Sequence, residues 1–370
     1  MIIIDQKIVP KGWRRKKFEE IVVENKKSLI KVRDAKPLDK YPFFTNGEKV
    51  LGYSDFFVDG ENIFMNTGGI AGVKFFNGKA AYSTDIYSFK AKNDAKYLYY
   101  ILLNDIDKIN KNFFSGSGLK HLQKSDFRKY ELKFPATINE QKKIAEILSA
   151  IDEEIQKTDE IISRTEKLKK GLMQDLFTKG IGHTKFKKTK IGDIPERWEI
   201  KIFEEFATLQ RGFDLPTKNR IPGEYPLVTS NGITSTHNES KVKAPGVVTG
   251  RSGTLGNVFY IENDFWPLNT TLYVKDFHNN NEKFVYYKIQ SFGLARFGAG
   301  TGVPTLNRNI VHKEVIAIPD HAEQKKIADI LSSTDDKINI NNIFKEKLTK
   351  LKKGLMRDLL SGGVRVNAKV

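Results

Sequence analysis

Several glycine-rich segments have the residue types and spacing of catalytic loops. FSGSG, from Phe114, fits the FxGxG loop that binds S-adenosylmethionine in methyltransferases, and GAGTG, from Gly298, is a looser copy. An adenine methyltransferase also needs a DPPY-type segment to hold its target base, and the sequence contains no Pro-Pro pair. Because lone glycine patterns are weak indicators, we interpret both loops as turns.

Two other patterns resemble phosphate-binding and nuclease signatures. GVKFFNGK, from Gly72, has one residue too many between its glycines for a Walker A loop. PDHAEQK, from Pro319, resembles the PD…ExK signature of nucleases, but its carboxylates fall at the predicted cap and first turn of a helix, where capping accounts for them. The sequence has no cysteine, and its six histidines form no HxxH or HxxxH pair. We therefore expect no catalytic residue, no metal site and no cofactor bound by this chain.

The composition favours a nucleic acid as the partner. The chain has 370 residues, enough for two domains, and a net charge of +17. Its 62 basic residues are accompanied by 45 acidic ones, so the positive field belongs to folded surfaces rather than to a basic tail. The first residues contain too short an apolar run for a secretory signal, and no later window has the apolar length of a membrane span. We expect the protein to be cytoplasmic.

Nearly the same helical segment occurs twice in the chain. EQKKIAEILSAID begins at Glu140 and EQKKIADILSSTD begins at Glu323, and the two copies end in KLKKGLMQDL and KLKKGLMRDL. Apolar residues recur at intervals of four and three, which is the period of a coiled-coil seam. Thr158, Thr165 and Lys169 weaken the seam of the first copy, and polar seam positions favour one register and a short helix pair.

Start and stop signals set the bounds of these helices. Thr137 and Asp320 each lie three residues before a glutamate of the repeat, which is the spacing of a capping box. Gly180 and the pair 362–363 follow the last apolar residues, as expected for glycines that adopt positive φ. The predicted helices occupy 139–180 and 320–363, with about 38 helical residues each, or roughly 57 Å at 1.5 Å per residue.

Each predicted helix also contains an interior glycine. Gly171 and Gly354 each cost roughly 1 kcal/mol relative to alanine at such positions. We expect the opposing helix or a partner protein to approach closely there, and the alternative is a frayed, solvated helix end.

The segments before the two helices correspond as well. VPKGWRRKKFEE, from Val9, matches IPERWEIKIFEE, from Ile194, and aligns Trp13 with Trp198, which we interpret as core anchors. Both segments contain short β-branched and aromatic runs interrupted by Gly, Asn and Pro, with one short helical stretch. We predict one domain over 1–138, a second over 181–319 that starts with a short linker, and a C-terminal tail over 364–370.

The two helices define the predicted architecture. Burial of their apolar stripes against each other requires the second helix to run antiparallel to the first. We predict an α+β protein in which two domains are joined by two long antiparallel helices that form a coiled coil, with internal pseudo-two-fold symmetry. Dimeric DNA readers place their half-sites about 34 to 36 Å apart, and helices of this length can span that separation. Because the two domains differ in their interiors, the expected DNA site is bipartite and asymmetric.

Loop residues with side chains suited to base edges and phosphates are the candidates for DNA contact. Asn and Arg form bidentate contacts with adenine and guanine, and Lys suits phosphates, although loops on any solvated surface are polar. The candidates are Asn46, Asn66, Thr67, Lys120 and His121 in the first domain and Asn231, Arg251, Ser252, Arg296, Asn307 and Arg308 in the second. The expected helix and partner interface comprises Ile144, Leu148, Ile151, Gly171, Leu172, Ile327, Leu331, Gly354 and Leu355.

These motifs together resemble a known family. Two domains opened by VPKGW and IPERW, closed by GSGLKHL and GTGVPTL and followed by EQKKIA helices that end in KLKKGLM are similar to the specificity subunits of type I restriction-modification systems. The resemblance covers nearly the whole chain and implies a non-catalytic subunit whose two target-recognition domains read the two parts of a split DNA site. It also implies that some helix residues belong to shared helical regions rather than to base readout: Glu140, Gln141, Ile144 and Ala145, with Glu323, Gln324, Ile327 and Ala328.

The resemblance implies protein partners in addition to DNA. Two modification subunits, which carry S-adenosylmethionine and methylate adenine N6, would dock along the helices and domains, and restriction subunits that use ATP and Mg would join them. The second domain has TGVPTL where the first has SGLKHL, so loop contacts cannot be copied between domains. Two alternatives stay open: a free-standing bipartite DNA-binding regulator or architectural protein, and a self-contained modification enzyme with unfamiliar motifs.

Overall fold

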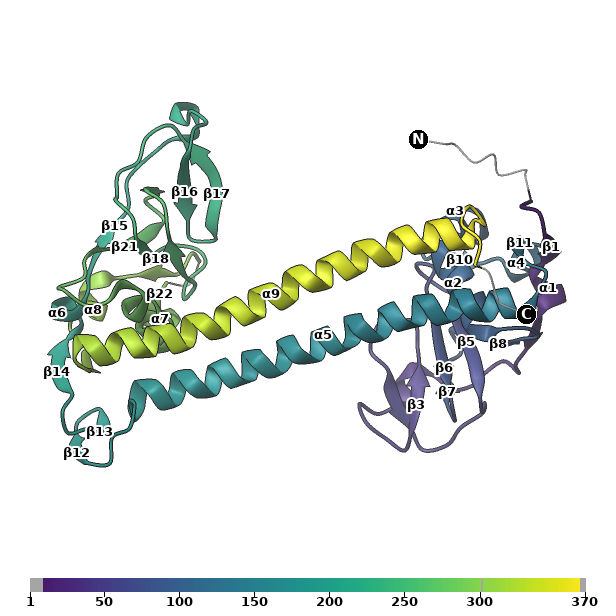
Figure 1. The fold of residues 1–370 in the computed structure, drawn as a ribbon, viewed down its shortest axis with the longest axis horizontal. Coiled ribbons are helices and arrows are strands. Elements are labelled where there is room, and N and C mark those ends of the chain that lie inside the picture. Colours follow the sequence, from purple (N-terminus) through teal and green to yellow (C-terminus); the bar gives the residue numbers. More distant parts are fainter. Residues whose placement is uncertain (1–8, 301, 367–370) are drawn as a thin grey trace. The chain divides into compact units, whose positions relative to one another are not determined.

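The computed structural model describes residues 9–300 and 302–366, which form two compact units. The first unit combines residues 1–159 with 344–370, and the second comprises residues 160–343. Each unit therefore contains one domain and a part of each of the two long helices, α5 (Ile138–Thr178) and α9 (His321–Leu360) (Figure 1).

The first unit contains two main sheets. One is a four-stranded antiparallel sheet with strand order β2-β8-β5-β6, and the other is a three-stranded sheet with strand order β4-β3-β7. The strands of these sheets are β2 (Val22–Glu24), β3 (Tyr41–Phe44), β4 (Leu51–Tyr53), β5 (Glu61–Asn66), β6 (Val73–Asn77), β7 (Ala81–Tyr82) and β8 (Ile86–Ala91). Two further antiparallel pairs are β1 (Trp13–Lys17) with β11 (Glu131–Pro135) and β9 (Phe114–Ser115) with β10 (His121–Leu122). The short helices are α1 (Phe18–Ile21), η1 (Val32–Asp34), α2 (Ala95–Asn104), α3 (Ile106–Phe113) and α4 (Lys124–Arg128).

The second unit repeats this order of elements. Its four-stranded sheet has the order β15-β21-β18-β19, and its three-stranded sheet has the order β17-β16-β20. These strands are β15 (Thr208–Arg211), β16 (Tyr225–Thr229), β17 (Gly232–His237), β18 (Gly246–Gly250), β19 (Val258–Ile261), β20 (Trp266–Pro267) and β21 (Thr271–Asp276). The remaining pairs are β12 (Phe186–Thr189) with β13 (Gly192–Pro195), β14 (Glu199–Ile202) with β24 (Val315–Ile318) and β22 (Gly298–Ala299) with β23 (Thr305–Leu306). The short helices are α6 (Phe203–Phe206), η2 (Thr217–Asn219), α7 (Glu282–Phe292), η3 (Leu294–Phe297) and α8 (Arg308–His312).

Local sequence explains the helix that covers each larger sheet. Asp94 caps α2 by accepting a hydrogen bond from the backbone N–H of Tyr97, and Asn281 caps α7 in the same way. Gly293 ends α7 in the left-handed region, with φ of 67°. The tryptophans that we interpret as core anchors, Trp13 and Trp198, are 6% and 1% exposed, which confirms that interpretation.

The two long helices are α5 (Ile138–Thr178) and α9 (His321–Leu360), with 41 and 40 residues. Both end just before a glycine of positive φ, Gly180 or Gly362, as predicted. The helices are thus slightly longer than the predicted 38 residues, and each begins within one residue or so of its predicted start.

Within each unit, the parts of α5 and α9 pack antiparallel. In the first unit, Asp152 and Asp159 of α5 pair with Lys352 and Lys345 of α9, so one heptad forward on α5 corresponds to one heptad backward on α9. Ile144 and Leu148 share a buried core with Leu359 and Leu360 of α9. In the second unit the same arrangement is made by Lys169 with Asp335 and by a core that joins Leu176 and Phe177 to Ile327 and Leu331.

The polar seam residues Thr158, Thr165 and Lys169 lie between the helices, and each has a hydrogen-bond or ion-pair partner. Thr158 and Thr165 are 3% and 7% exposed, and each hydroxyl donates to the carbonyl four residues earlier at 2.7 Å. The hydroxyl hydrogen bonds are therefore satisfied inside the helix itself. Lys169 forms an ion pair with Asp335 at 2.6 Å, so this seam position has a charged partner.

The structure departs from two expectations about the helices. Apart from the helix's own backbone, no described atom lies within 4 Å of a Cβ added at Gly171 or Gly354, so a close approach by the opposing helix is wrong, and an approach by a partner protein stays a prediction. The repeated glutamates do not complete capping boxes either. Asp320 does accept the N–H of Glu323, but the carboxylates of Glu140 and Glu323 bind distant partners instead.

Candidate nucleic-acid interface

In each unit, three chain segments meet beside the larger sheet. In the first unit they are the turn after β3, the loop 66–72 after β5, and the hairpin β9–β10. In the second unit they are the turn after β16, the loop 250–256 after β18, and the hairpin β22–β23. We call each meeting place a loop junction.

Backbone hydrogen bonds fix the first loop junction. The N–H of Leu122 donates to the carbonyl of Thr67 at 2.9 Å, and the N–H of Gly69 donates to the carbonyl of Lys120 at 2.8 Å. A bridge joins Gly68 to His121. The loop after β5 and the glycine-rich hairpin are therefore held side by side although about fifty residues separate them in the chain.

Two asparagines tie the turn after β3 to the same junction. Asn46 Nδ2 donates to the carbonyl of Gly68 at 3.2 Å, and Asn66 Nδ2 donates to the carbonyl of Ile70 at 3.1 Å. A Cβ at Gly72 would lie 2.6 Å from Asn66 Nδ2, so a side chain there would require the Asn66 amide to shift. The structure thus brings all five candidates of the first domain together: Asn46, Asn66, Thr67, Lys120 and His121.

The second loop junction has the same backbone frame. The N–H of Leu306 donates to the carbonyl of Arg251 at 2.7 Å, the N–H of Gly253 donates to the carbonyl of Pro304 at 3.2 Å, and a bridge joins Ser252 to Thr305. By these bonds, Arg251 occupies the place of Thr67, and Ser252 that of Gly68. The two junctions therefore present different side chains on one scaffold.

The candidates of the second domain divide into two groups. Arg251 Nη1 donates to the carbonyl of Asn269 at 3.1 Å, which fixes the guanidinium beside the junction, and Asn231 lies in the exposed turn after β16. Arg308 instead binds Gln210 Oε1 at 2.6 Å, and Asn307 caps α8. Arg308 and Asn307 therefore make contacts within the domain, although both lie next to the hairpin β22–β23 of the junction.

Arg296 lies in η3, directly before the glycine-rich hairpin. Its guanidinium carbon is 4.6 Å from the ring centroids of both Phe292 and Phe297, and its side chain stays 57% exposed. Stacking on two rings orients the guanidinium, and its Nη2 also lies 3.9 Å from Glu314 Oε2, so its charge is partly paired.

Sequence reasoning missed a polar network next to Arg251. Asp214 accepts two-pronged hydrogen bonds from Arg211 at 2.9 to 3.0 Å and a further one from Asn269 Nδ2. The Asn269 hydrogen bond and then that of Arg211 hold the pKa of Asp214 below its ordinary value. The spacing of Arg211 and Asp214 in RGFD could have indicated this pair, but no local signal points to Asn269.

Lys74 was also missed in the first unit. Its Nζ donates to the carbonyl of Thr45 at 2.6 Å and to that of Gly47, so it holds the turn after β3 from inside. Burial lowers the pKa of Lys74. Lys74 follows Val73 on β6, and only the sheet register brings it under the turn.

The long helices carry a second apolar surface besides their seam. Ile161 and Leu168 of α5 are 44% and 57% exposed, and their counterparts in the repeat, Phe344 and Leu351 of α9, are 47% and 51% exposed. Each pair is one heptad apart, so each lies on one face of its helix. We call each pair a copy of the exposed stripe. The copy with Phe344 and Leu351 belongs to the first unit, and the copy with Ile161 and Leu168 belongs to the second.

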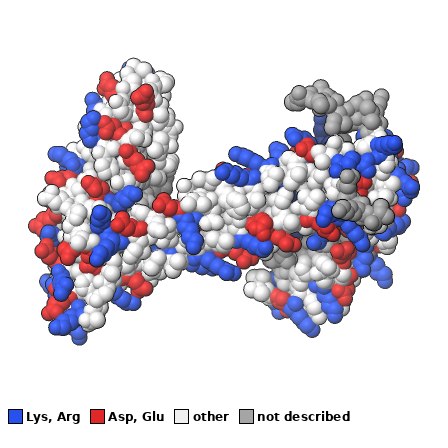
Figure 2. Space-filling view, viewed as in Figure 1, with Lys and Arg blue, Asp and Glu red and all other residues white. Residues whose placement is uncertain are grey.

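The other predicted interface residues are mostly part of the cores. Ile144, Leu148, Ile327 and Leu331 are fully buried, and Ile151, Leu172 and Leu355 are half-buried. Gly171 and Gly354 follow the exposed stripe by three residues in each copy, and Gly171 is exposed. Lysines and arginines are spread over the domains and the helices of both units, with acidic residues among them (Figure 2).

The part of the chain that the structure describes offers neither a metal site nor a membrane span. No three His, Asp or Glu side chains in it are grouped so that they could hold a metal ion. No helix among the described residues is long and apolar enough to cross a membrane.

Comparison with known proteins gives consistent matches over most of the chain. Residues 10–166 and 195–350 each match the family model described as the type I restriction modification DNA specificity domain. The chain is 28% identical to the type I restriction enzyme MjaVIII specificity subunit of Methanocaldococcus jannaschii, over 88% of this chain and 83% of that protein. It is 25% identical to the putative type I specificity subunit S.MgeORF438P of Mycoplasma genitalium, over 72% of this chain and 74% of that protein.

Solved structures show the same fold. The S subunit of a type I restriction-modification system from M. genitalium aligns with a TM-score of 0.72 and 18% identity, over 97% of this chain and 98% of that one. A chain from a structure on complex assembly and conformational transition of a type I R-M system aligns with a TM-score of 0.57 and 12% identity, over 96% of this chain and 100% of that one.

Proposed function

Because the chain belongs to the family of type I restriction-modification DNA specificity subunits, which serve DNA sequence recognition, we propose that each of its units reads one part of a bipartite, asymmetric DNA site. The observation that carries this proposal is the pair of loop junctions. They have the same backbone frame but different side chains, as two modules that read different bases through one docking geometry require.

The side chains at the junctions have the chemistry of base readout. In the first unit, Lys120 and His121 are exposed at the junction, and Lys120 suits a phosphate. The amides of Asn46 and Asn66 are held by backbone carbonyls, so these two residues shape the loops that carry the readout. Ile70 and Leu119 are 75% and 65% exposed at the tips of the same loops, where they can contact thymine methyl groups. In the second unit, Arg251 takes the place that Thr67 has in the first unit, and its guanidinium suits guanine.

We propose that the chain itself is non-catalytic and acts with partner subunits. S-adenosylmethionine would be bound by modification subunits, and ATP and Mg by restriction subunits. The exposed stripe supports docking of two modification subunits, because the same apolar pair recurs in both units and two similar surfaces favour two copies of one partner.

The test is to express the chain with a DNA adenine methyltransferase subunit of a type I system, purify it by a tag on the chain, and map N6-methyladenine in the host genome. The proposal predicts co-purification of the methyltransferase and a split motif with unread base pairs between its two parts. A chain that binds DNA but never retains the methyltransferase would indicate a free-standing regulator and contradict the proposal. Methylation by the chain alone would contradict its non-catalytic role.

A further inference from the structure

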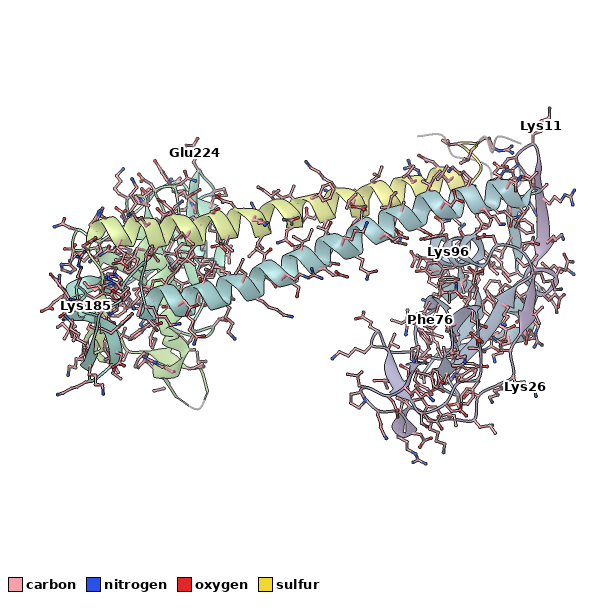
Figure 3. The ribbon with its side chains drawn as sticks, turned by 60° about the horizontal axis from the view of Figure 1, so that its bottom comes forward. Lys11, Lys26, Phe76, Lys96, Lys185 and Glu224 are labelled. Carbon is pink, nitrogen blue, oxygen red and sulfur yellow. The ribbon has the colours of Figure 1, made fainter. Side chains whose placement is uncertain are left out.

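Each unit has a cleft where a short helix of the domain meets a long helix. In the first unit the cleft lies between α2 and α5 and has a volume of about 400 Å³, and in the second it lies between α7 and α9 and has a volume of about 180 Å³. Figure 3 labels Lys96, which lines the first cleft from α2. The two clefts share three lining positions of the repeat: Lys96 and Lys283, Ser149 and Ser332, and Glu153 and Asp336.

One repeated set of contacts lies at the two clefts. Its tyrosine and aspartate line the second cleft, and in the first unit the tyrosine contacts the lining residue Ser149. Tyr100 Oη donates to Asp152 Oδ2 at 2.7 Å, and Lys352 Nζ binds the other oxygen of Asp152 at 2.5 Å. In the second unit, Tyr287 donates to Asp335 at 2.7 Å, and Lys169 completes the set at 2.6 Å. Asp152 and Asp335 are thus occupied by contacts within the chain, which makes them structural residues.

The outer acids of the clefts lack such a role. Glu153 and Asp336 each follow the structural aspartate by one residue, and both are exposed. Tyr260 and Tyr286, with ring centroids 5.9 Å apart, line the second cleft beside Asp336. The equivalent rings of the first unit, Phe75 and Tyr99, are 6.1 Å apart but are not among the residues that line the first cleft. A carboxylate next to aromatic faces suits a guanidinium, which forms hydrogen bonds in its plane and stacks through its face.

The charge of the clefts is opposite to that of the chain. The second cleft is lined by Glu262, Asp335 and Asp336 but by one cation, Lys283. The first is lined by three acids, Asp94, Glu146 and Glu153, and by two lysines. On a chain with a net charge of +17, two acidic clefts at equivalent places disfavour DNA phosphates and favour a basic side chain of a protein.

Each cleft also lies near the level of one copy of the exposed stripe along the helix pair. Lys169, which pairs with Asp335 at the second cleft, directly follows Leu168. Lys352, which pairs with Asp152 at the first, directly follows Leu351. The exposed leucine and the acidic cleft therefore lie at the same level of the helix pair in both units.

We propose that each cleft receives an arginine side chain of a modification subunit, so that one chain holds two copies of that subunit through equivalent arginine contacts. This inference rests on the function proposed above and names the polar anchor of the partner interface. The loop junctions differ between units because the two DNA half-sites differ, whereas the clefts keep their acids because the partner is the same.

Charge reversal with a count of bound subunits tests the proposal. The variants are Glu153→Lys, Asp336→Lys and the double variant, each expressed with the methyltransferase subunit and weighed intact by native mass spectrometry. We expect two bound subunits for the natural chain, one for each single variant and none for the double variant. Exposed acids on the same helices but outside the clefts, Glu166→Lys and Glu346→Lys, are matched controls and should retain two subunits.

A milder change separates docking from folding. Asp336→Asn keeps the shape of the side chain and should weaken binding at one of the two sites by about tenfold, with an unchanged circular dichroism spectrum. A double charge-reversal variant that still holds two subunits would overturn the arginine contact while leaving the proposed function intact. A natural chain that holds none would overturn both.

Discussion

At the scale of single residues, Glu323 shows how the start of a long helix is joined to the domain before it. Its carboxylate accepts the N–H of Ile181 at 2.8 Å and Nε1–H of Trp198 at 3.1 Å, and it lies 2.9 Å from Nε2 of His183. In the first unit Arg365 binds the equivalent Glu140 at 2.7 and 2.8 Å. The repeated glutamate therefore makes tertiary contacts at the start of each long helix. The capping-box pattern did not predict these contacts, because every partner is distant in sequence.

Removal of this joint should destabilise the second unit. Glu323→Ala leaves the buried donors of Trp198 and Ile181 without an acceptor, and each such donor costs about 1 to 3 kcal/mol. We expect the free energy of unfolding to fall by roughly 3 kcal/mol, with a smaller loss for Glu323→Gln, which keeps one acceptor. Urea unfolding followed by tryptophan fluorescence measures this, and Glu224→Ala, at an exposed glutamate labelled in Figure 3, is the control. Equal stabilities of Glu323→Ala and the control would refute the role.

A buried lysine gives the second unit a pH-dependent stability. Lys288 is 8% exposed, and its Nζ lies 5.1 Å from the ring centroid of Phe177. Burial lowers the pKa of Lys288 to about 8, from an ordinary value of 10.5. Between these two pH values the unfolded chain binds more protons than the folded one, so stability rises with pH there, and the full cost applies below pH 8.

Lys288→Ile should remove this cost, because the first unit has the buried Ile101 at the equivalent position. We expect a gain on the order of 3 kcal/mol at pH 7 and loss of the rise in stability between pH 8 and 10.5. Urea unfolding at pH 7 and pH 10 measures both effects, with Lys337→Ile at an exposed position of α9 as the control. A variant less stable than the natural chain at pH 7 would contradict the assignment.

At the scale of elements, the sequence pattern was sufficient for the long helices and not for the loop junctions. Heptad spacing and terminal glycines depend on neighbours a few residues away, so they predicted α5 and α9 with nearly correct ends. The junctions depend on bonds such as that between Leu122 and Thr67, which join segments far apart in the chain. Residue type alone therefore could not separate Arg251, at the junction, from Arg308, which binds Gln210 and Leu209.

The interior glycines of the helices give a prediction at this scale. Since no described residue lies within 4 Å of a Cβ at Gly171 or Gly354, alanine at each should stabilise the isolated chain by up to about 1 kcal/mol. The same methyl groups should weaken retention of a methyltransferase subunit that packs against the exposed stripe. Asn342→Ala, on an exposed face of α9, controls for helix propensity and should leave retention unchanged. If the glycine variants gain stability and retain the partner fully, the glycines are not part of its docking surface.

At the scale of the whole molecule, each unit is completed by a segment from the other end of the chain. The core of the first domain includes Leu359 and Leu360 of α9, and Glu140 binds Arg365 from beyond that helix. In the repeat, Leu176 of α5 stands where Leu359 stands in α9. One copy of the repeat can therefore replace the other.

A fragment of residues 1–180 should consequently form a homodimer. Residues 160–178 of each copy would supply the apolar face that residues 344–360 supply in the full chain. With a methyltransferase subunit, this dimer should direct methylation to a symmetric site built from the half-site of the first unit. Light scattering gives its mass. A fragment that is monomeric although its circular dichroism shows an intact domain would contradict the interchange.

We infer above all that the two loop junctions read separate parts of one DNA site. Arg251→Thr places in the second unit the residue that the first unit has at the equivalent position, and Thr67→Arg makes the reverse change. Genome-wide mapping of N6-methyladenine in cells that express each variant with the methyltransferase is the direct measurement. We predict that each variant alters one part of the split motif, a different part in each case, and leaves the other part and the spacer unchanged. Motifs altered in both parts, or altered by neither variant, would contradict the claim.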